Sequence, residues 1–125
     1  MINKISTDKA PKAIGPYSQA IMVNNVIYTS GTLPINTETG NIDAVGIKEQ
    51  AEQVMKNLAA VLEAGGATFD NVVKTTCFLA DIADFAAFNE VYAKYITSAP
   101  ARSCFAVKDL PKGALVEVEV IAYLA

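Results

Sequence analysis

The single arginine of this chain, Arg102, is the residue whose type most strongly indicates chemistry. It follows Pro100 and Ala101 at the start of a β-rich run, and every other basic side chain is a lysine. A guanidinium presents a planar pair of donors that matches a carboxylate, which an ammonium group cannot do. The residues alone favour a plainer interpretation, an ion pair with Glu117 or Glu119 across a final hairpin, because such pairs are common on strands.

The two acids themselves have an unusual setting, since they alternate with valines in the run 115–121. Period-two geometry places the valines on one face of a strand and Glu117 and Glu119 on the opposite face, which they share with Leu115 and Ile121. Acids among apolar neighbours on a strand require a reason, either structural or functional.

Other candidate positions each have a plainer alternative. Tyr17 is expected at a loop-to-strand corner, half-buried as tyrosines usually are. Ser30 and Gly31 end a β-rich run where glycine permits close approach of a ligand, although a simple strand exit is favoured. Asn89 is a solvated helix position unless a cleft runs past it. Cys104 faces the same side of its strand as the arginine and is more often a small core residue than a nucleophile.

Composition excludes several classes of function. The chain contains no histidine, which removes Ser-His-Asp and Cys-His nucleophile systems and nearly all catalytic zinc sites, so no metal is expected. A net charge of −3 without a basic stripe argues against nucleic-acid binding. No apolar run reaches the roughly 18 residues of a membrane span, and the N-terminal residues lack the apolar run of a signal peptide. With Cys77 and Cys104 expected to be reduced, the predicted localisation is cytoplasmic.

The elements that must position these side chains follow from the apolar pattern. Asn24 and Asn25 separate two β-rich runs and predict a tight hairpin, while Gly65 and Gly66 are expected to end the first helix. The expected elements are an irregular lead-in over 1–16, strands over 17–23, 26–30, 71–79, 102–107 and 115–124, and helices over 46–64 and from about Asp84.

The order β-β-α-β-α-β-β over one domain, residues 1–125, predicts a two-layer α+β fold in which two helices cover one face of a single sheet. The chain is 52% hydrophobic, which is generous for a core of this size. Part of that apolar surface is therefore expected at a subunit interface.

Several motifs occur together and in one order: Ala13-Ile14-Gly15-Pro16-Tyr17-Ser18-Gln19-Ala20, Thr29-Ser30-Gly31, Val73-Lys74-Thr75-Thr76, Pro100-Ala101-Arg102-Ser103 and Glu117-Val118-Glu119. In this combination the whole chain resembles the RidA family, also called YjgF, of reactive-intermediate or 2-iminobutanoate/2-iminopropanoate deaminases. One departure is the connection 95–100, which is shorter than is usual in the family and has Ala99 in place of the customary aromatic residue.

The resemblance implies a chorismate-mutase-like fold and a homotrimer, with the sheets forming a central barrel and clefts between neighbouring subunits. It implies that Arg102 holds the carboxylate of the substrate and that Glu117 activates a water molecule, Glu119 being the less favoured acid. The residues implied to line the cleft are Tyr17, Ser30, Gly31, Asn89 and Cys104, the last through nearby backbone groups.

The implied reaction is hydrolysis of 2-aminoacrylate/2-iminopropanoate and 2-aminocrotonate/2-iminobutanoate to 2-keto acids and ammonia. Dehydratases that use pyridoxal phosphate would supply these intermediates, and no cofactor is needed because positioning a carboxylate and one water supplies the modest gain required. The alternatives are a non-catalytic trimer that binds 2-keto acids through Arg102, an endoribonuclease or translation inhibitor, and a scaffolding trimer. The acidic pI and the absence of histidine argue against the second.

Overall fold

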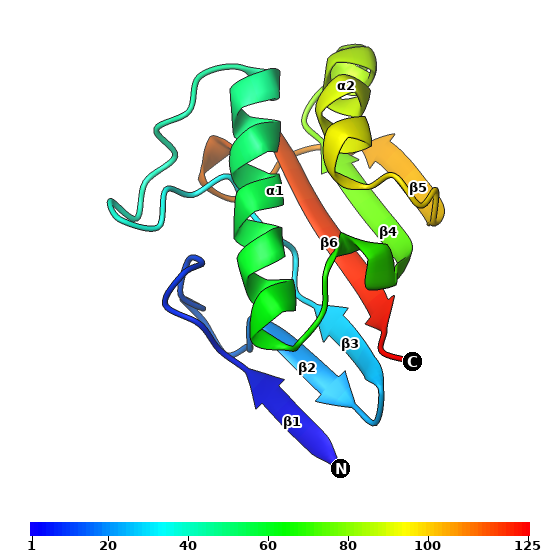
Figure 1. The fold of residues 1–125 in the computed structure, drawn as a ribbon. Coiled ribbons are helices and arrows are strands. Elements are labelled where there is room, and N and C mark those ends of the chain that lie inside the picture. Colours follow the sequence, from blue (N-terminus) through cyan, green and yellow to red (C-terminus); the bar gives the residue numbers. More distant parts are fainter.

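The sheet of this protein has six strands in the order β1-β2-β3-β6-β4-β5, in a computed structural model that describes residues 1–125 (Figure 1). The strands are β1 (Ile2–Ile5), β2 (Ala20–Val23), β3 (Val26–Thr29), β4 (Val72–Leu79), β5 (Ala101–Ala106) and β6 (Val116–Tyr123). The helices are α1 (Ile47–Ala64) and α2 (Phe85–Tyr95), with short 3-10 turns at Phe69–Asn71, Ile82–Asp84 and Pro111–Gly113.

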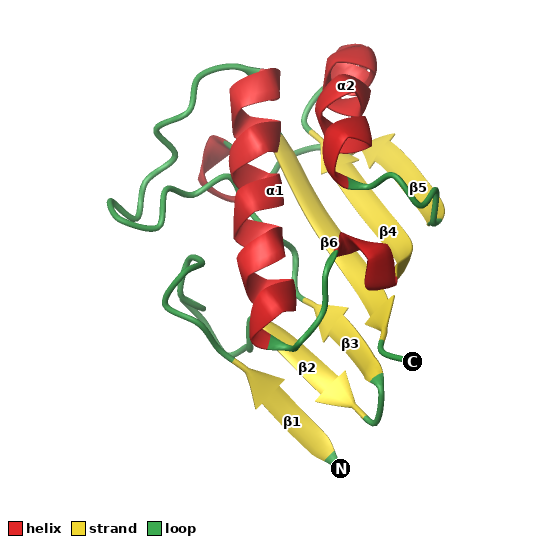
Figure 2. Cartoon of the chain, viewed as in Figure 1, coloured by secondary structure: helices red, strands yellow, loops and turns green.

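Both helices lie on the same face of the sheet, which confirms the predicted two-layer α+β architecture (Figure 2). The core lies between these layers and includes Leu58 and Leu62 of α1 together with Val116 and Val118 of β6, all fully buried. The alternation predicted for β6 is also confirmed, because its valines are buried while Glu119 is exposed. The opposite face of the sheet has no helix over it.

Two predicted chain reversals are confirmed. Strands β2 and β3 pair through Val23 and Val26, so Asn24 and Asn25 form a two-residue hairpin loop. Asn24 has a φ of 53°, a left-handed conformation that asparagine tolerates well. Helix α1 ends with Gly65 at its C-cap, as expected.

The N-terminal lead-in is not wholly irregular, contrary to the prediction. Ile2–Ile5 form β1, which pairs antiparallel with β2 along its whole length and makes one edge of the sheet. The segment is mostly exposed, so it lacks the apolar run that marks a buried strand. The next strand begins at Ala20 rather than Tyr17, because Gly15–Tyr17 form a turn closed by the Tyr17 N–H on the Gly15 carbonyl at 2.8 Å.

The predicted final hairpin between the last two strands is wrong. Strand β6 inserts between β3 and β4 and is antiparallel to both, whereas β5 pairs only with β4 and runs parallel to it. Helix α2 forms the crossover that a parallel pair requires. The last two strands are therefore separated by β4, and β5 is the second edge of the sheet (Figure 1).

The start of the second helix needs a smaller correction. Asp84 occupies the N-cap position of α2 but makes no side-chain capping hydrogen bond. Asp81 caps the preceding 3-10 turn instead, accepting from the Ala83 N–H at 2.9 Å. Neither helix is both long enough and apolar enough to cross a membrane.

Candidate functional site

Arg102 lies on edge strand β5 and points toward α2, where three side chains contact it. Its Nη1 donates a hydrogen bond to Asn89 Oδ1 at 2.6 Å. Its Cζ lies 4.8 Å from the ring centroid of Tyr92 and 5.4 Å from that of Phe85. We call these four residues the arginine group.

The arginine group forms because one stripe of α2 faces β5. Phe85, Asn89 and Tyr92 are spaced by four and three residues, and such positions lie on one face of a helix. Tyr92 is buried, whereas Phe85 is only partly buried. Asn89 is more than a solvated helix position, since it accepts from the guanidinium.

Arg102 has no carboxylate partner within the chain. The ion pairs are made by lysines alone, Lys9 with Glu63, Lys48 with Glu90 and Lys94 with Glu52. The structural ion pair across a final hairpin is therefore not formed, because the register of the sheet does not bring those strands together. A partly buried guanidinium without an anion is left available to a ligand.

Cys104 shares the face of β5 with Arg102, as predicted, and lies directly opposite Cys77 on β4. Both cysteines are free thiols. Burial raises the pKa of Cys77 to about 12 and also raises the pKa of Cys104. Raised thiol pKa values disfavour a nucleophilic thiolate, and Cys104 packs against the core as the plainer interpretation expected.

Glu117 is half-buried on the face of the sheet that the helices leave open. Burial, and secondly the negative charge of Glu119, raise the pKa of the Glu117 carboxyl above its ordinary value. Gly31 lies against this carboxyl so closely that a Cβ on Gly31 would stand 1.8 Å from Glu117 Oε2. Only a residue without a side chain leaves the carboxyl in its observed position.

Gly31 is held in this place by backbone pairing on both sides. Thr32 and Val118 exchange two backbone hydrogen bonds, at 2.8 Å and 3.2 Å. Farther along the same loop, the buried side chain of Asn57 on α1 donates to the carbonyls of Leu33 and Ile35 at 3.0 Å and 2.9 Å. The loop after β3 is thus attached to both β6 and α1.

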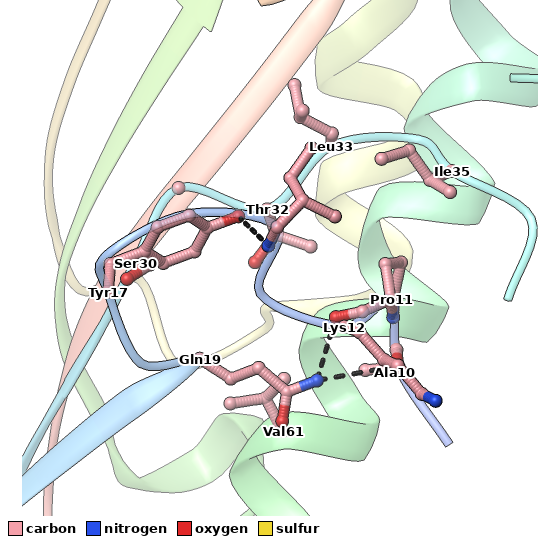
Figure 3. A pocket seen from close by; sticks show the side chains of 12 residues that line it. Ala10, Pro11, Lys12, Tyr17, Gln19, Ser30, Thr32, Leu33, Ile35 and Val61 are labelled. Carbon is pink, nitrogen blue, oxygen red and sulfur yellow. Dashed lines mark hydrogen bonds between the residues drawn. The ribbon is translucent and has the colours of Figure 1, made fainter. Parts of the chain in front are cut away.

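Ser30 and Tyr17 lie next to this position, at the mouth of a pocket between the N-terminal segment and the loop after β3 (Figure 3). Ser30 Oγ donates to the Ser18 carbonyl at 2.6 Å, and the half-exposed Tyr17 accepts at its hydroxyl from the Ile14 N–H at 3.4 Å. The pocket is lined by Ala10, Pro11, Lys12, Ile14, Tyr17, Gln19, Ser30, Gly31, Thr32, Leu33, Ile35 and Val61. We call Glu117, Gly31, Ser30 and Tyr17 the glutamate group.

Gln19 is a residue whose role the sequence interpretation missed. Its Nε2 donates to the Pro11 carbonyl at 2.7 Å and to the Thr7 carbonyl at 3.1 Å, while its Oε1 accepts from the Thr7 N–H at 2.7 Å. These bonds attach the N-terminal segment to β2, and Figure 3 shows the amide between the two parts of the chain. The only signal in the sequence was its place within the Ala13–Ala20 motif.

Arg102 and Glu117 lie on opposite faces of the sheet. Arg102 pairs with Thr75, which is fully buried beneath the helices, whereas Glu117 pairs with Phe78 on the alternate side of β4. Paired residues of neighbouring strands share a face, and successive residues alternate. A single copy of the chain therefore does not bring Arg102 and Glu117 together.

A second depression adjoins the arginine group. It is open to solvent and is lined by Asn89, Tyr92, Ala93, Ile96, Thr97, Ala99, Pro100 and Arg102. Ala99 has a φ of 55°, so the short connection after α2 turns sharply through a left-handed residue. The small side chain at this position leaves the depression open beside the guanidinium.

Comparison with known proteins places the chain in a family. It belongs to the family described as endoribonuclease L-PSP, whose sequence pattern matches residues 7–124. Within that family the resemblance to RidA is confirmed, since relatives that share half of its residues have reactive-intermediate deaminase names.

The relatives agree in sequence and in fold. The chain is 50% identical over 121 residues to Reactive Intermediate Deaminase A, chloroplastic, of Arabidopsis thaliana, covering 96% of this chain and 65% of that protein. It is 49% identical over 119 residues to 2-iminobutanoate/2-iminopropanoate deaminase of Homo sapiens, covering 94% of this chain and 87% of that protein. The crystal structure of E. coli TdcF with bound serine has a TM-score of 0.94 and 36% identity, covering 98% of this chain and 99% of that chain.

Proposed function

We propose that this protein is a deaminase that hydrolyses 2-iminopropanoate and 2-iminobutanoate, with their enamine tautomers, to 2-keto acids and ammonia. The observation that carries the proposal is the sole arginine, partly buried against α2 and without a carboxylate partner in its own chain. Such a group is suited to bind a small carboxylate. Relatives that are about 50% identical in sequence are named as deaminases of this kind.

The Arg102 guanidinium would hold the carboxylate of the 2-imino acid. Asn89 accepts a hydrogen bond from Nη1, and the other donor nitrogens of the guanidinium have no hydrogen-bond partner in the chain. The TdcF structure is described as containing bound serine, which is also a small molecule with a carboxylate next to a nitrogen-bearing carbon. A charge-assisted hydrogen bond of this kind contributes about 1.5–3 kcal/mol.

Glu117 would act as the general base. It takes a proton from water as the water oxygen bonds to C2 of the protonated imine and the C=N electron pair moves to nitrogen, giving a neutral carbinolamine. The protonated carboxyl then gives that proton to the amino nitrogen. As the C–N bond breaks, the hydroxyl proton passes to the Glu117 carboxylate, the C2–O bond becomes a carbonyl, and the departing ammonia takes this proton from the carboxyl and leaves as ammonium. A raised pKa makes the Glu117 carboxylate a stronger base for the first step.

The two half-sites would meet between copies of the chain, with Arg102 and Asn89 from one copy and the glutamate group from its neighbour. The open face of the sheet supports this assembly, since Tyr28, Phe105 and Tyr123 are 44–49% exposed there. Apolar rings of this number on an uncovered sheet face are typical of an interface. The closed form that we propose is a homotrimer, in which each of the three interfaces forms one site.

The substrate would come from dehydratases that use pyridoxal phosphate, because elimination from a hydroxy-amino acid releases an enamine. We propose that the protein acts beside them in the cytoplasm, where two free thiols on neighbouring strands persist in the reduced state.

The decisive test is the decay of 2-iminobutanoate, generated in situ, with and without the purified protein. A faster decay that depends on protein concentration supports the deaminase. An unchanged rate together with binding of 2-oxobutanoate would indicate a sensor of 2-keto acids. Because the matching family is described as an endoribonuclease, the same preparation is incubated with RNA; cleavage without imine hydrolysis would overturn the proposal.

The composite site has a separate test, in which Arg102→Lys and Glu117→Gln chains are unfolded together and refolded as a mixture. If each site takes its arginine from one copy and its glutamate from another, random mixing restores on the order of a quarter of the sites. Each variant refolded alone is the control and stays defective. A mixture that remains as inactive as its components would show that both residues act within one chain.

A further inference from the structure

We propose that the ring of Tyr92, with Phe85 beside it, is a positioning element that holds the Arg102 guanidinium ready for a carboxylate while leaving its charge uncompensated. This inference rests on the proposed function and deepens it. It assigns a role to aromatic residues whose helical spacing is typical of core positions.

The geometry points to the rings because they contact the guanidinium itself. Arg102 Cζ lies within 4.8 Å of the Tyr92 centroid and 5.4 Å of the Phe85 centroid, inside the range at which a cation is attracted by an aromatic face. The contact to Tyr92 is largely removed from water, since that side chain is only 8% exposed. An attraction of this kind is stronger where water is excluded.

Tyr92 is fixed in turn by the strand beside Arg102. Its hydroxyl is hydrogen-bonded to Thr75 Oγ1 at 2.9 Å, and Thr75 is fully buried on β4. Thr75 is also the residue that pairs with Arg102 across β4 and β5. The ring is therefore tied to the same point of the sheet from which the arginine side chain starts, so both move together.

Every group that holds the guanidinium is neutral. Asn89 offers an amide oxygen, and Tyr92 and Phe85 offer ring faces. A carboxylate in the place of Asn89 would hold Arg102 more strongly, but it would also neutralise the positive charge that is needed to bind the substrate carboxylate. The neutral contacts orient the fork before the ligand arrives, which lowers the ordering cost of binding.

The first test uses the nuclear magnetic resonance signal of the Arg102 Nε–H, which is unambiguous because the chain has a single arginine. Two variants separate the ring from the hydroxyl: Tyr92→Leu removes the ring face, and Tyr92→Phe keeps it but loses the bond to Thr75. We expect a ring-current shift of this signal in the wild type and in Tyr92→Phe, and its loss in Tyr92→Leu. The matched control is Tyr95→Leu, one turn farther along α2, whose ring packs on Phe69 instead of on a cation.

The second readout is titration of 2-oxobutanoate while the same signal is followed. We expect Tyr92→Leu to weaken the Kd about tenfold and to raise KM by a similar factor with a smaller change in kcat, the size of one desolvated cation–π contact. Asn89→Asp keeps the hydrogen-bond acceptor and adds a negative charge beside Arg102, so it should also weaken binding of the 2-oxobutanoate anion. Phe85→Leu serves in place of Tyr92→Leu if the latter does not fold.

The outcomes distinguish this inference from the proposed function. If the wild-type signal does not respond to 2-oxobutanoate, carboxylate binding at Arg102, and with it the proposed function, fails. If the wild type responds but Tyr92→Leu and Phe85→Leu bind equally well, the function stands and the positioning role is wrong. The role is also wrong if Tyr92→Phe is as defective as Tyr92→Leu, or if Tyr95→Leu raises KM as much.

Discussion

The arginine group and the glutamate group are built in different ways. Arg102 is held by side chains of a single helix, which supply one hydrogen bond and two ring faces. Glu117 is placed by the backbone around it, where the missing side chain of Gly31 leaves room for the carboxyl and the Thr32–Val118 bridge fixes that gap. Side-chain contacts thus orient the Arg102 guanidinium, whereas the space left by Gly31 determines the position of the Glu117 carboxyl.

Because they are built differently, the arginine group and the glutamate group should tolerate substitutions differently. A side chain held by several independent contacts loses function in steps as those contacts are removed. A carboxyl that fits only because one Cβ is absent is sensitive to a single methyl group. Variants in each group therefore distinguish the two kinds of construction.

The largest effect is expected for Glu117→Gln, which keeps the shape of the side chain and removes its basicity. Loss of a general base lowers the rate by about 10²–10⁴-fold, so kcat for 2-iminobutanoate should fall by that order while KM changes little. Glu119→Gln, on the same face but exposed, is the control and should keep most of the activity. Equal losses in both variants would mean that the acids act through their charge and not through one positioned base.

Arg102→Lys should have the next largest effect, and mainly on binding. An ammonium keeps the charge but lacks the planar fork, so KM and the Kd of 2-oxobutanoate should rise about ten- to a hundredfold. Steady-state kinetics with isothermal titration measures both quantities. Full activity of this variant would remove the guanidinium fork from the site.

Gly31→Ala tests directly whether the space left by Gly31 determines the position of the Glu117 carboxyl. The new Cβ would overlap Glu117 Oε2, so the carboxyl must move, and kcat should fall about tenfold or more, as when a catalytic group is misplaced by a fraction of an ångström. In the Glu117→Gln background the same change should cost much less, because the two residues act as a unit. Additive losses in this double-mutant cycle would contradict the close coupling of Gly31 and Glu117.

The smallest effect concerns stability against pH. Because burial and Glu119 raise the Glu117 pKa in the folded state, the folded protein loses stability as pH rises through that pKa and the carboxyl ionises. Glu117→Gln removes this cost, so its Tm should exceed that of the wild type by a few degrees at most at pH 8, with no difference at pH 4. Thermal scans at both pH values test this. A lower Tm than wild type at pH 8 would instead indicate a cation, supplied by another copy, that stabilises the ionised carboxyl.

Sequence reasoning predicts the layers of this fold well, because the helical periodicity of 47–64 and the alternation of 116–123 each follow from burial on one side. It fails on the order of strands. Pairing of β5 with β4 depends on contacts between segments far apart in the chain, which local pattern does not encode. For the same reason it predicted a hairpin where the chain inserts β6 between two earlier strands.

The candidate site likewise combines residues that the local sequence singles out with contacts that depend on distant segments. Residue type singled out Arg102 and the pair Glu117 and Glu119, and only the family resemblance implied the roles of Arg102, Glu117 and Gly31. The structure explains the need for space at Gly31. Tyr92 and Phe85 were not predicted, since aromatic residues at helical spacing are usually core and only the register of β5 brings a cation to them. Their spacing with Asn89 on one helix face was the signal available.

The central position of β6 has a consequence for how the chain acquires its structure. Strands β1, β2 and β3 form one antiparallel ribbon and β4 and β5 a separate parallel pair, and no ladder joins the two until residues 116–123 lie between them. An N-terminal fragment that ends before β6 would hold two disconnected pieces of sheet with exposed edges, prone to aggregate. Nascent chains would therefore remain prone to aggregation until β6 has been translated. Folding should then be completed in a single late, cooperative step.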